Sequence, residues 1–131
     1  MIFVTADSCR AQLERLTQIL VSSFPGSTIY RHTELGHVPH DVLNHKVDTV
    51  VLEAEMEHGG GLELVRKLHR QKAELTVFLV SRTGDSRRAA EEAGANGYFV
   101  LPEEETLLLD AIRSGKNRGN DAAGDRNPIR C

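Results

Sequence analysis

The chain has 131 residues, a hydrophobic content of 40% and a formal net charge of −3. These values are typical of one globular domain that buries an ordinary core, and they exclude a wholly disordered chain. No apolar run approaches the length that a membrane-spanning helix needs, and no signal-peptide pattern opens the sequence, so we expect a cytoplasmic protein.

Charge distribution and cysteine usage narrow the function classes further. Four basic and two acidic residues give residues 116–131 a net charge of +2, so −5 remains for residues 1–115. An acidic body disfavours direct nucleic-acid binding by residues 1–114. Residues 115–131 are rich in Gly, Asn, Asp and Arg, which predicts a flexible tail or linker. The two cysteines, Cys9 and Cys131, form no CxxC motif and predict free thiols.

Alternating segments predict one domain over residues 1–114. Apolar or β-branched segments predict five strands, at residues 2–5, 27–32, 47–52, 76–80 and 98–100. Apolar spacing and terminal signals predict five helices, at residues 9–24, 36–46, 62–71, 86–93 and 103–113. Because crossovers between parallel strands are right-handed, this alternation predicts a doubly wound parallel α/β sheet with helices on both faces.

Punctuating residues support these bounds. Asp7 and Ser8 are N-cap residue types before the first helix, and Pro39 suits the first turn of the second. Gly94 supplies a left-handed stop for the fourth helix. Gly59, Gly60 and Gly61 lack the sequence context of a phosphate-binding loop and predict a flexible loop instead.

The third predicted strand ends at a carboxylate. Val50, Val51 and Leu52 show no period of two, which is typical of a central parallel strand covered on both faces. Because the crevices of open α/β sheets lie beyond the carboxyl ends of the strands, Glu53 is expected at the floor of any functional site. Three arginines border the same crevice, and a solvated face is favoured over an anion site for them; they are Arg82, Arg87 and Arg88.

Metal binding by histidine is not indicated. His37, His40 and His45 cluster in the sequence, but no cysteine or second ligand pair completes a tetrahedral set. We therefore expect no metal site built from these side chains.

Four stretches carry a family resemblance: DTVVLE from Asp48, GLELVRKL from Gly61, VFLVS from Val77 and AGANGYFVLP from Ala93. Together and in this order, they resemble the receiver domain of bacterial two-component response regulators, a CheY-like, flavodoxin-like fold, over residues 1 to about 114. The resemblance implies strand order 2-1-3-4-5 and a site at the ends of the first, third, fourth and fifth strands.

In that family an aspartate accepts a phosphoryl group from a histidine kinase, beside an acidic pair that holds Mg²⁺, a hydroxyl residue, and a lysine that precedes a cis-proline. The resemblance assigns these positions to the following residues: Glu53 as the phosphoacceptor equivalent, Asp7 as the remnant of the acidic pair, Ser81 as the hydroxyl position, Tyr98 as the aromatic switch position, Leu101 as the lost lysine and Pro102 as the cis-proline.

These departures predict a receiver without the chemistry of its family. Phosphoryl transfer depends on positioning and charge neutralisation, and Leu101 cannot neutralise charge. Because Ala6 replaces one carboxylate of the acidic pair, we expect weak Mg²⁺ binding at most and no other cofactor. Glu53 brings one charge, whereas a phosphate brings about −1.5 to −2, so it mimics a phosphorylated aspartate only in part. We expect a non-enzymatic pseudo-receiver that acts by phosphorylation-independent protein recognition or dimerisation.

The resemblance implies a partner surface on the fourth helix, fifth strand and fifth helix, including Tyr98 and Phe99. For Tyr98, a half-buried packing role is favoured over a switch. Ser81 is equally compatible with a strand-end cap, and Glu53 and Asp7 with solvated carboxylates kept apart by water. Two other functions stay open: a divergent receiver still phosphorylated or metal-binding at Glu53, and the N-terminal regulatory half of a DNA-binding response regulator.

Overall fold

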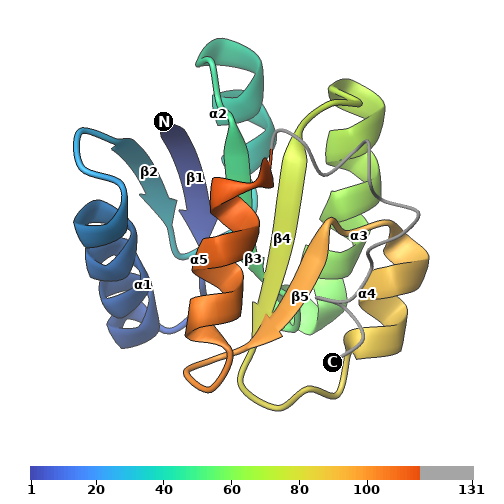
Figure 1. Cartoon of the computed structure of the whole chain (residues 1–131). Coiled ribbons are helices and arrows are strands. Elements are labelled where there is room, and N and C mark those ends of the chain that lie inside the picture. Colours follow the sequence, from blue (N-terminus) through green and yellow to red (C-terminus); the bar gives the residue numbers. More distant parts are fainter. Residues whose placement is uncertain (116–131) are drawn as a thin grey trace.

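The computed structural model describes residues 1–115, in which five strands alternate with five helices (Figure 1). Apart from Gly115, the tail predicted at residues 115–131 lies outside the described residues. The strands are β1 (Ile2–Ala6), β2 (Thr28–His32), β3 (Thr49–Glu53), β4 (Thr76–Ser81) and β5 (Gly97–Val100). The helices are α1 (Arg10–Ser23), α2 (Val38–Asn44), α3 (Met56–Gln71), α4 (Arg87–Ala93) and α5 (Glu105–Arg113).

The five strands form one parallel sheet in the order β2-β1-β3-β4-β5, which confirms the predicted topology. β3 lies at the centre, where Val50 pairs with Val4 of β1 and Val77 of β4. Val50, Val51 and Leu52 are completely buried. A strand covered on both faces needs apolar side chains on both, which explains the uninterrupted apolar run.

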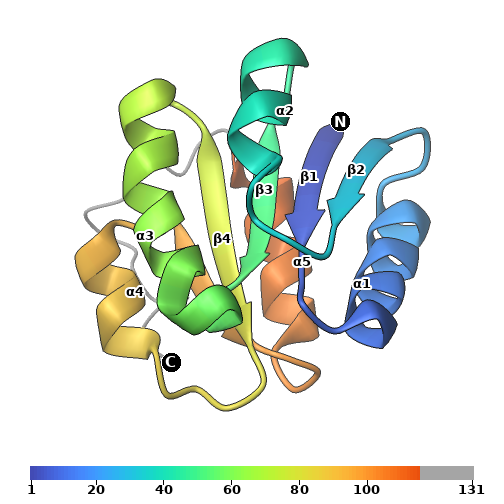
Figure 2. The ribbon, with the colours of Figure 1, turned by 180° about the vertical axis from the view of Figure 1, so that it is seen from behind.

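Helices cover the two faces of the sheet unequally. α1 and α5 lie on one face, and α2, α3 and α4 lie on the other (Figures 1 and 2). Val50 and Leu52 contribute to the core beneath α2, α3 and α4, whereas Val51 joins the core beneath α1 and α5. Successive side chains of one strand thus anchor both layers, as the period of two in a strand requires.

The glycine-rich segment, predicted as a flexible loop, begins in a left-handed kink at Gly59 and continues as helix at Gly60 and Gly61. α3 already begins at Met56 and contains a left-handed kink at Glu57, His58 and Gly59. Gly61 is buried in the helix, and a Cβ at this position would lie 2.4 Å from the backbone oxygen of Glu53. Gly61 therefore permits a close approach of α3 to the end of β3, where no other residue type fits.

Two helix-end predictions are confirmed. Pro39 lies in the first turn of α2, and Gly94 ends α4 with a φ of 88°. Among residues 1–115, no helix has the length and apolar character needed to cross a membrane.

Candidate functional site

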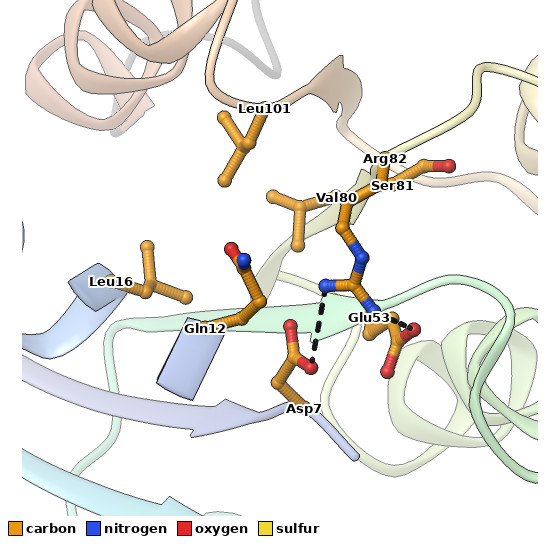
Figure 3. Close-up of a pocket in the computed structure, with 8 residues that line it drawn as sticks. All are labelled: Asp7, Gln12, Leu16, Glu53, Val80, Ser81, Arg82 and Leu101. Carbon is orange, nitrogen blue, oxygen red and sulfur yellow. Dashed lines mark hydrogen bonds and ion pairs between the residues drawn. The ribbon is translucent and has the colours of Figure 1, made fainter. Parts of the chain in front are cut away.

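The predicted site residues meet at the carboxyl edge of the sheet. Asp7 follows β1, Glu53 ends β3, Ser81 ends β4 and Leu101 follows β5. All four line one small pocket, shown in Figure 3. The pocket leaves about 10 Å³ of space, which is room for about one water molecule.

Both carboxylate oxygens of Glu53 have protein partners. The backbone N–H and the hydroxyl of Ser8 donate to Oε1 at 2.9 and 2.7 Å. The Nη2 atom of Arg82 donates to Oε2 at 3.3 Å. Glu53 is only 7% exposed, so it is a bonded, buried carboxylate and not a solvated one.

These partners set the charge of Glu53. Burial by itself raises the pKa of this carboxyl group, but the hydrogen bonds from Ser8 and the positive charge of Arg82 outweigh it. The pKa of Glu53 is therefore lowered from its ordinary value of 4.5. Glu53 is ionised at neutral pH.

Asp7 is held differently. It is 4% exposed, and its Oδ1 atom accepts the backbone N–H of Cys9 at 2.8 Å and lies 3.9 Å from Nη1 of Arg82. Burial raises the pKa of Asp7 to about 6, and the charge of Glu53 adds to this rise, while the Cys9 N–H and Arg82 oppose it. Two neighbouring carboxyl groups thus have pKa values that are moved in opposite directions.

The predicted N-cap of α1 was wrong. The N-cap residue is Cys9, and no side chain caps the helix. The hydroxyl of Ser8 instead bonds Glu53, and the carboxylate of Asp7 bonds the Cys9 N–H. The side chains of Asp7 and Ser8, which the sequence pattern assigned to the helix end, therefore make contacts in the site instead.

The Ser81 hydroxyl forms hydrogen bonds with residues other than Glu53. It donates to Oε2 of Glu55 at 2.9 Å and accepts the backbone N–H of Thr83 at 3.1 Å. Ser86 donates its own hydroxyl to the same Glu55 oxygen at 2.8 Å. In Figure 3 the Ser81 hydroxyl points away from the carboxylate pair. Ser81 therefore ties the loop between β4 and α4 to the loop after β3.

Tyr98 is not the half-buried residue with a wet tip that the sequence favoured. It is completely buried, and its hydroxyl accepts the backbone N–H of Ser86 at 3.1 Å. The guanidinium of Arg87 lies 5.0 Å from the centre of the ring, in cation–π range. The start of α4 covers the ring and leaves it no contact with solvent.

The cis-proline predicted at Pro102 is confirmed, since the peptide bond between Leu101 and Pro102 is cis. The Leu101 side chain lines the pocket and packs against the core beneath α1 and α5. It brings no charge to the position where the family resemblance implies a lysine.

Arg82 is the site residue whose contacts the sequence reasoning missed. A solvated face was favoured for Arg82, Arg87 and Arg88; the Arg82 side chain is 42% exposed, but it and Arg87 also form ion pairs. Arg82 pairs with both site carboxylates, and Arg87 pairs with Glu104 at 3.3 Å. Charge balance could have indicated this pairing. Two strand-end carboxylates without a lysine need another cation, and Arg82 directly follows a strand end.

Histidine clusters do not add a metal centre to this picture. In the part of the chain that the structure describes, no group of three or more His, Cys, Asp or Glu side chains is placed to hold a metal ion. His45 instead stacks on Tyr30, with ring centres 4.2 Å apart.

Comparison with known proteins gives consistent matches. The model of the response regulator receiver domain family matches residues 3–113. The nitrate/nitrite response regulator protein NarP of Escherichia coli is 28% identical over 106 residues, which cover 79% of this chain and 49% of NarP. The C4-dicarboxylate transport transcriptional regulatory protein DctD of Pseudomonas aeruginosa is 36% identical over 66 residues, 49% of this chain and 14% of DctD. The chain thus spans about half of NarP and a small part of DctD.

Solved structures agree on the fold. A response regulator receiver domain protein from Clostridium thermocellum superposes with a TM-score of 0.77 and 19% identity, covering 91% of this chain and 96% of the other. At that identity the likeness shows the shared fold alone.

Proposed function

The chain belongs to the response regulator receiver domain family, and we propose that it is a member that signals by protein recognition without being phosphorylated. In this proposal the domain is a pseudo-receiver within a two-component signalling protein. It binds a protein partner or a second copy of itself, and it is not an enzyme.

The state of Glu53 carries this proposal. A phosphoacceptor carboxylate needs a free oxygen to attack phosphorus and a cation to neutralise the incoming group. Ser8 and Arg82 engage both oxygens of Glu53. Leu101 supplies no charge, and Ala6 supplies no second carboxylate for a metal. The oxygens of the nucleophile are therefore engaged, and the groups that would neutralise the incoming charge are absent.

The contact surface we propose lies on α4 and α5, with β5 as their support. Tyr98 and Phe99 cannot contribute contacts because both are completely buried, which corrects the sequence-based surface. Leu107 of α5 is 44% exposed and offers an apolar contact. Arg87 and Glu104 form an ion pair at 3.3 Å, which holds the start of α4 to the residue before α5. A surface fixed in this way needs no phosphoryl group to assemble it.

A phosphodonor assay tests the proposed function. The full chain is incubated with Mg²⁺ and a small phosphodonor such as phosphoramidate, and the intact protein is weighed by mass spectrometry. We expect no phosphoryl adduct on the wild type. The positive control is a variant with Ala6→Asp, Glu53→Asp, Leu101→Lys and Arg82→Ala, which restores the family residues and removes the guanidinium.

An adduct on wild-type Glu53 would overturn the proposal in favour of a divergent phosphoacceptor. An adduct on the restored variant alone supports it, because the scaffold is then shown to be competent and the missing side chains explain the inactivity. The partner surface is tested separately: Leu107→Asp should abolish self-association in analytical ultracentrifugation or pull-down of a partner, whereas Val21→Asp on α1 should not.

A second candidate is a regulatory role within a DNA-binding regulator. The matches to NarP, a response regulator protein, and to DctD, a transcriptional regulatory protein, favour this candidate. It is compatible with the first, since a pseudo-receiver can serve as the regulatory unit of a longer protein. A gel-shift assay in which residues 1–115 alone bind DNA would contradict our expectation that this part does not contact nucleic acid.

A further inference from the structure

Arg82 reaches from the end of β4 to the ends of two other strands. Its Nη2 atom lies 3.3 Å from Oε2 of Glu53, and its Nη1 atom lies 3.9 Å from Oδ1 of Asp7. In Figure 3 the guanidinium lies between the two carboxylates, with one contact to each. One side chain thus joins β1, β3 and β4 at the site.

The two carboxylates create a need for this cation. Asp7 and Glu53 are each less than a tenth exposed, and two buried like charges destabilise one another unless a positive charge lies beside them. The family resemblance implies a lysine and a divalent metal for this task. Leu101 occupies the lysine position, so the guanidinium of Arg82 supplies the positive charge.

Mg²⁺ does not fit the same site. This ion prefers near-octahedral oxygen ligation and keeps several of its waters. Both oxygens of Glu53 already accept hydrogen bonds, and Oδ1 of Asp7 accepts the Cys9 N–H. Ala6 contributes no side-chain oxygen, and the pocket leaves about 10 Å³ of space, which is room for about one water.

We propose that the Arg82 guanidinium is the resident cation of this site and takes over the neutralising role of the divalent metal. The proposal rests on the proposed function, since it specifies how the site of a pseudo-receiver is kept stable without ligand. The same contacts also link the loop after β4 to the end of β3 and the residues after it. Arg82 holds the loop after β4 to Glu53, while Ser81 and Ser86 hold the same loop to Glu55.

Removing the guanidinium should reopen the site to divalent cations. In Arg82→Gln, the two carboxylates lose their counter-ion, and the guanidinium no longer repels an incoming Mg²⁺ ion. We expect the Mg²⁺ affinity of the full chain to rise by at least about tenfold, which corresponds to about 1.4 kcal/mol. The affinity is measured by isothermal titration calorimetry and by the rise of the melting temperature with Mg²⁺.

Two matched variants control this test. Arg88→Gln removes the same charge from an exposed position on α4 and should leave Mg²⁺ binding as weak as in the wild type. Arg82→Lys keeps a positive charge and should also keep Mg²⁺ binding weak. Wild-type affinity equal to that of Arg82→Gln, or an equal gain in Arg88→Gln, would overturn the proposal.

A second measurement does not depend on whether a variant of Arg82 folds. The side-chain Nε–H signal of Arg82 in the wild type should shift when Glu53→Gln removes the paired charge, whereas the Nε–H signal of Arg88 should not. An unchanged Arg82 signal would overturn the ion pair and the proposal with it.

The two proposals fail in different ways. A phosphoryl adduct on wild-type Glu53 would overturn the proposed function. An unmodified wild type in which Arg82→Gln gains no Mg²⁺ affinity would overturn only the role of Arg82 as resident cation.

Discussion

The middle and the end of β3 follow different physical rules. In the middle, Val50, Val51 and Leu52 are completely buried and are held by apolar contact with helices on both faces. One residue later, Glu53 is 7% exposed and is held by a hydroxyl, a backbone N–H and a guanidinium. The first region depends on shape and burial, and the second depends on charge balance.

This difference explains how a receiver fold can be kept while the residues at its carboxyl edge change. The topology rests mainly on the packing of the strand centres, so polar side chains at the carboxyl edge, such as Glu53, can change while the topology stays the same. At the edge, however, changes must keep charges paired, since an unpaired buried charge is costly. In our proposal, Leu101 at the position where the resemblance implies a lysine, together with the guanidinium of Arg82, satisfies this condition.

Leu52→Ala tests the apolar half of the comparison and should have the largest effect. Leu52 is completely buried, so the substitution leaves a cavity and should lower the free energy of unfolding by about 2–5 kcal/mol. Urea denaturation measures the change. Leu107→Ala, on the exposed face of α5, is the matched control and should change stability by less than about 0.5 kcal/mol. Equal effects of the two variants would contradict the assignment of the core.

Asp7→Asn tests the charged half through its pH dependence. The pKa of Asp7 is about 6 in the folded protein and 3.8 ordinarily, so the folded state binds this proton more tightly. Stability from this group is therefore present at low pH and is lost as pH rises from about 4 to above 6, by about 3 kcal/mol in total. Asn cannot ionise, so the variant should lack this loss and be more stable than the wild type at pH 7.

Urea denaturation of wild type and Asp7→Asn at a series of pH values measures this difference. The comparison cancels the histidines, which titrate in both proteins. Glu53 acts with the opposite sign, because its pKa is lowered and its contribution is lost only as pH falls below its ordinary 4.5. A difference between the two proteins that does not change between pH 4.5 and pH 7 would contradict the raised pKa of Asp7.

Ser8→Ala should have the smallest effect of the three. It removes one hydroxyl hydrogen bond to the charged Glu53 and keeps the backbone one, so we expect a loss of about 1.5 kcal/mol at pH 7. The pKa of Glu53 should rise, which carboxyl-carbon NMR can follow. Ser22→Ala, an exposed change in α1, should leave that pKa where it is. A Glu53 pKa that is the same in Ser8→Ala and the wild type would show that the hydroxyl is not its partner in solution.

The sequence predicted the fold well because the middle of each strand is governed by local pattern. Apolar runs and Gly94 were sufficient for the number of elements and for the end of α4, and the family resemblance supplied the strand order. Burial of Tyr98 and Phe99 was missed because it depends on tertiary packing: the start of α4 covers Tyr98, and Phe99 lies in the core beneath α1 and α5. Gly61 was missed because its close approach to Glu53 is a tertiary contact.

The site was predicted only in part, for a related reason. The strand-end positions of Glu53, Asp7, Ser81 and Leu101 follow from topology, and they do line one pocket. Their partners do not follow, since Ser8 and Glu53 are 45 residues apart and Ser8 fits a helix cap equally well. The pairing of Arg82 with Glu53 does not follow either, because an arginine in a loop after a strand is ordinarily solvated, and 42% of this side chain is exposed.

A titration of the wild-type full chain with Mg²⁺ and then beryllofluoride tests the central claim most directly, with amide NMR signals of Ser81 and Tyr98 as the readout. Beryllofluoride mimics a phosphoryl group on a carboxylate, and its binding needs an accessible oxygen and a divalent cation. We predict that neither addition shifts these signals, because Arg82 and Ser8 already occupy Glu53. Shifts that saturate with millimolar Mg²⁺ and move again with beryllofluoride would contradict the claim and restore a phosphorylation switch at this site.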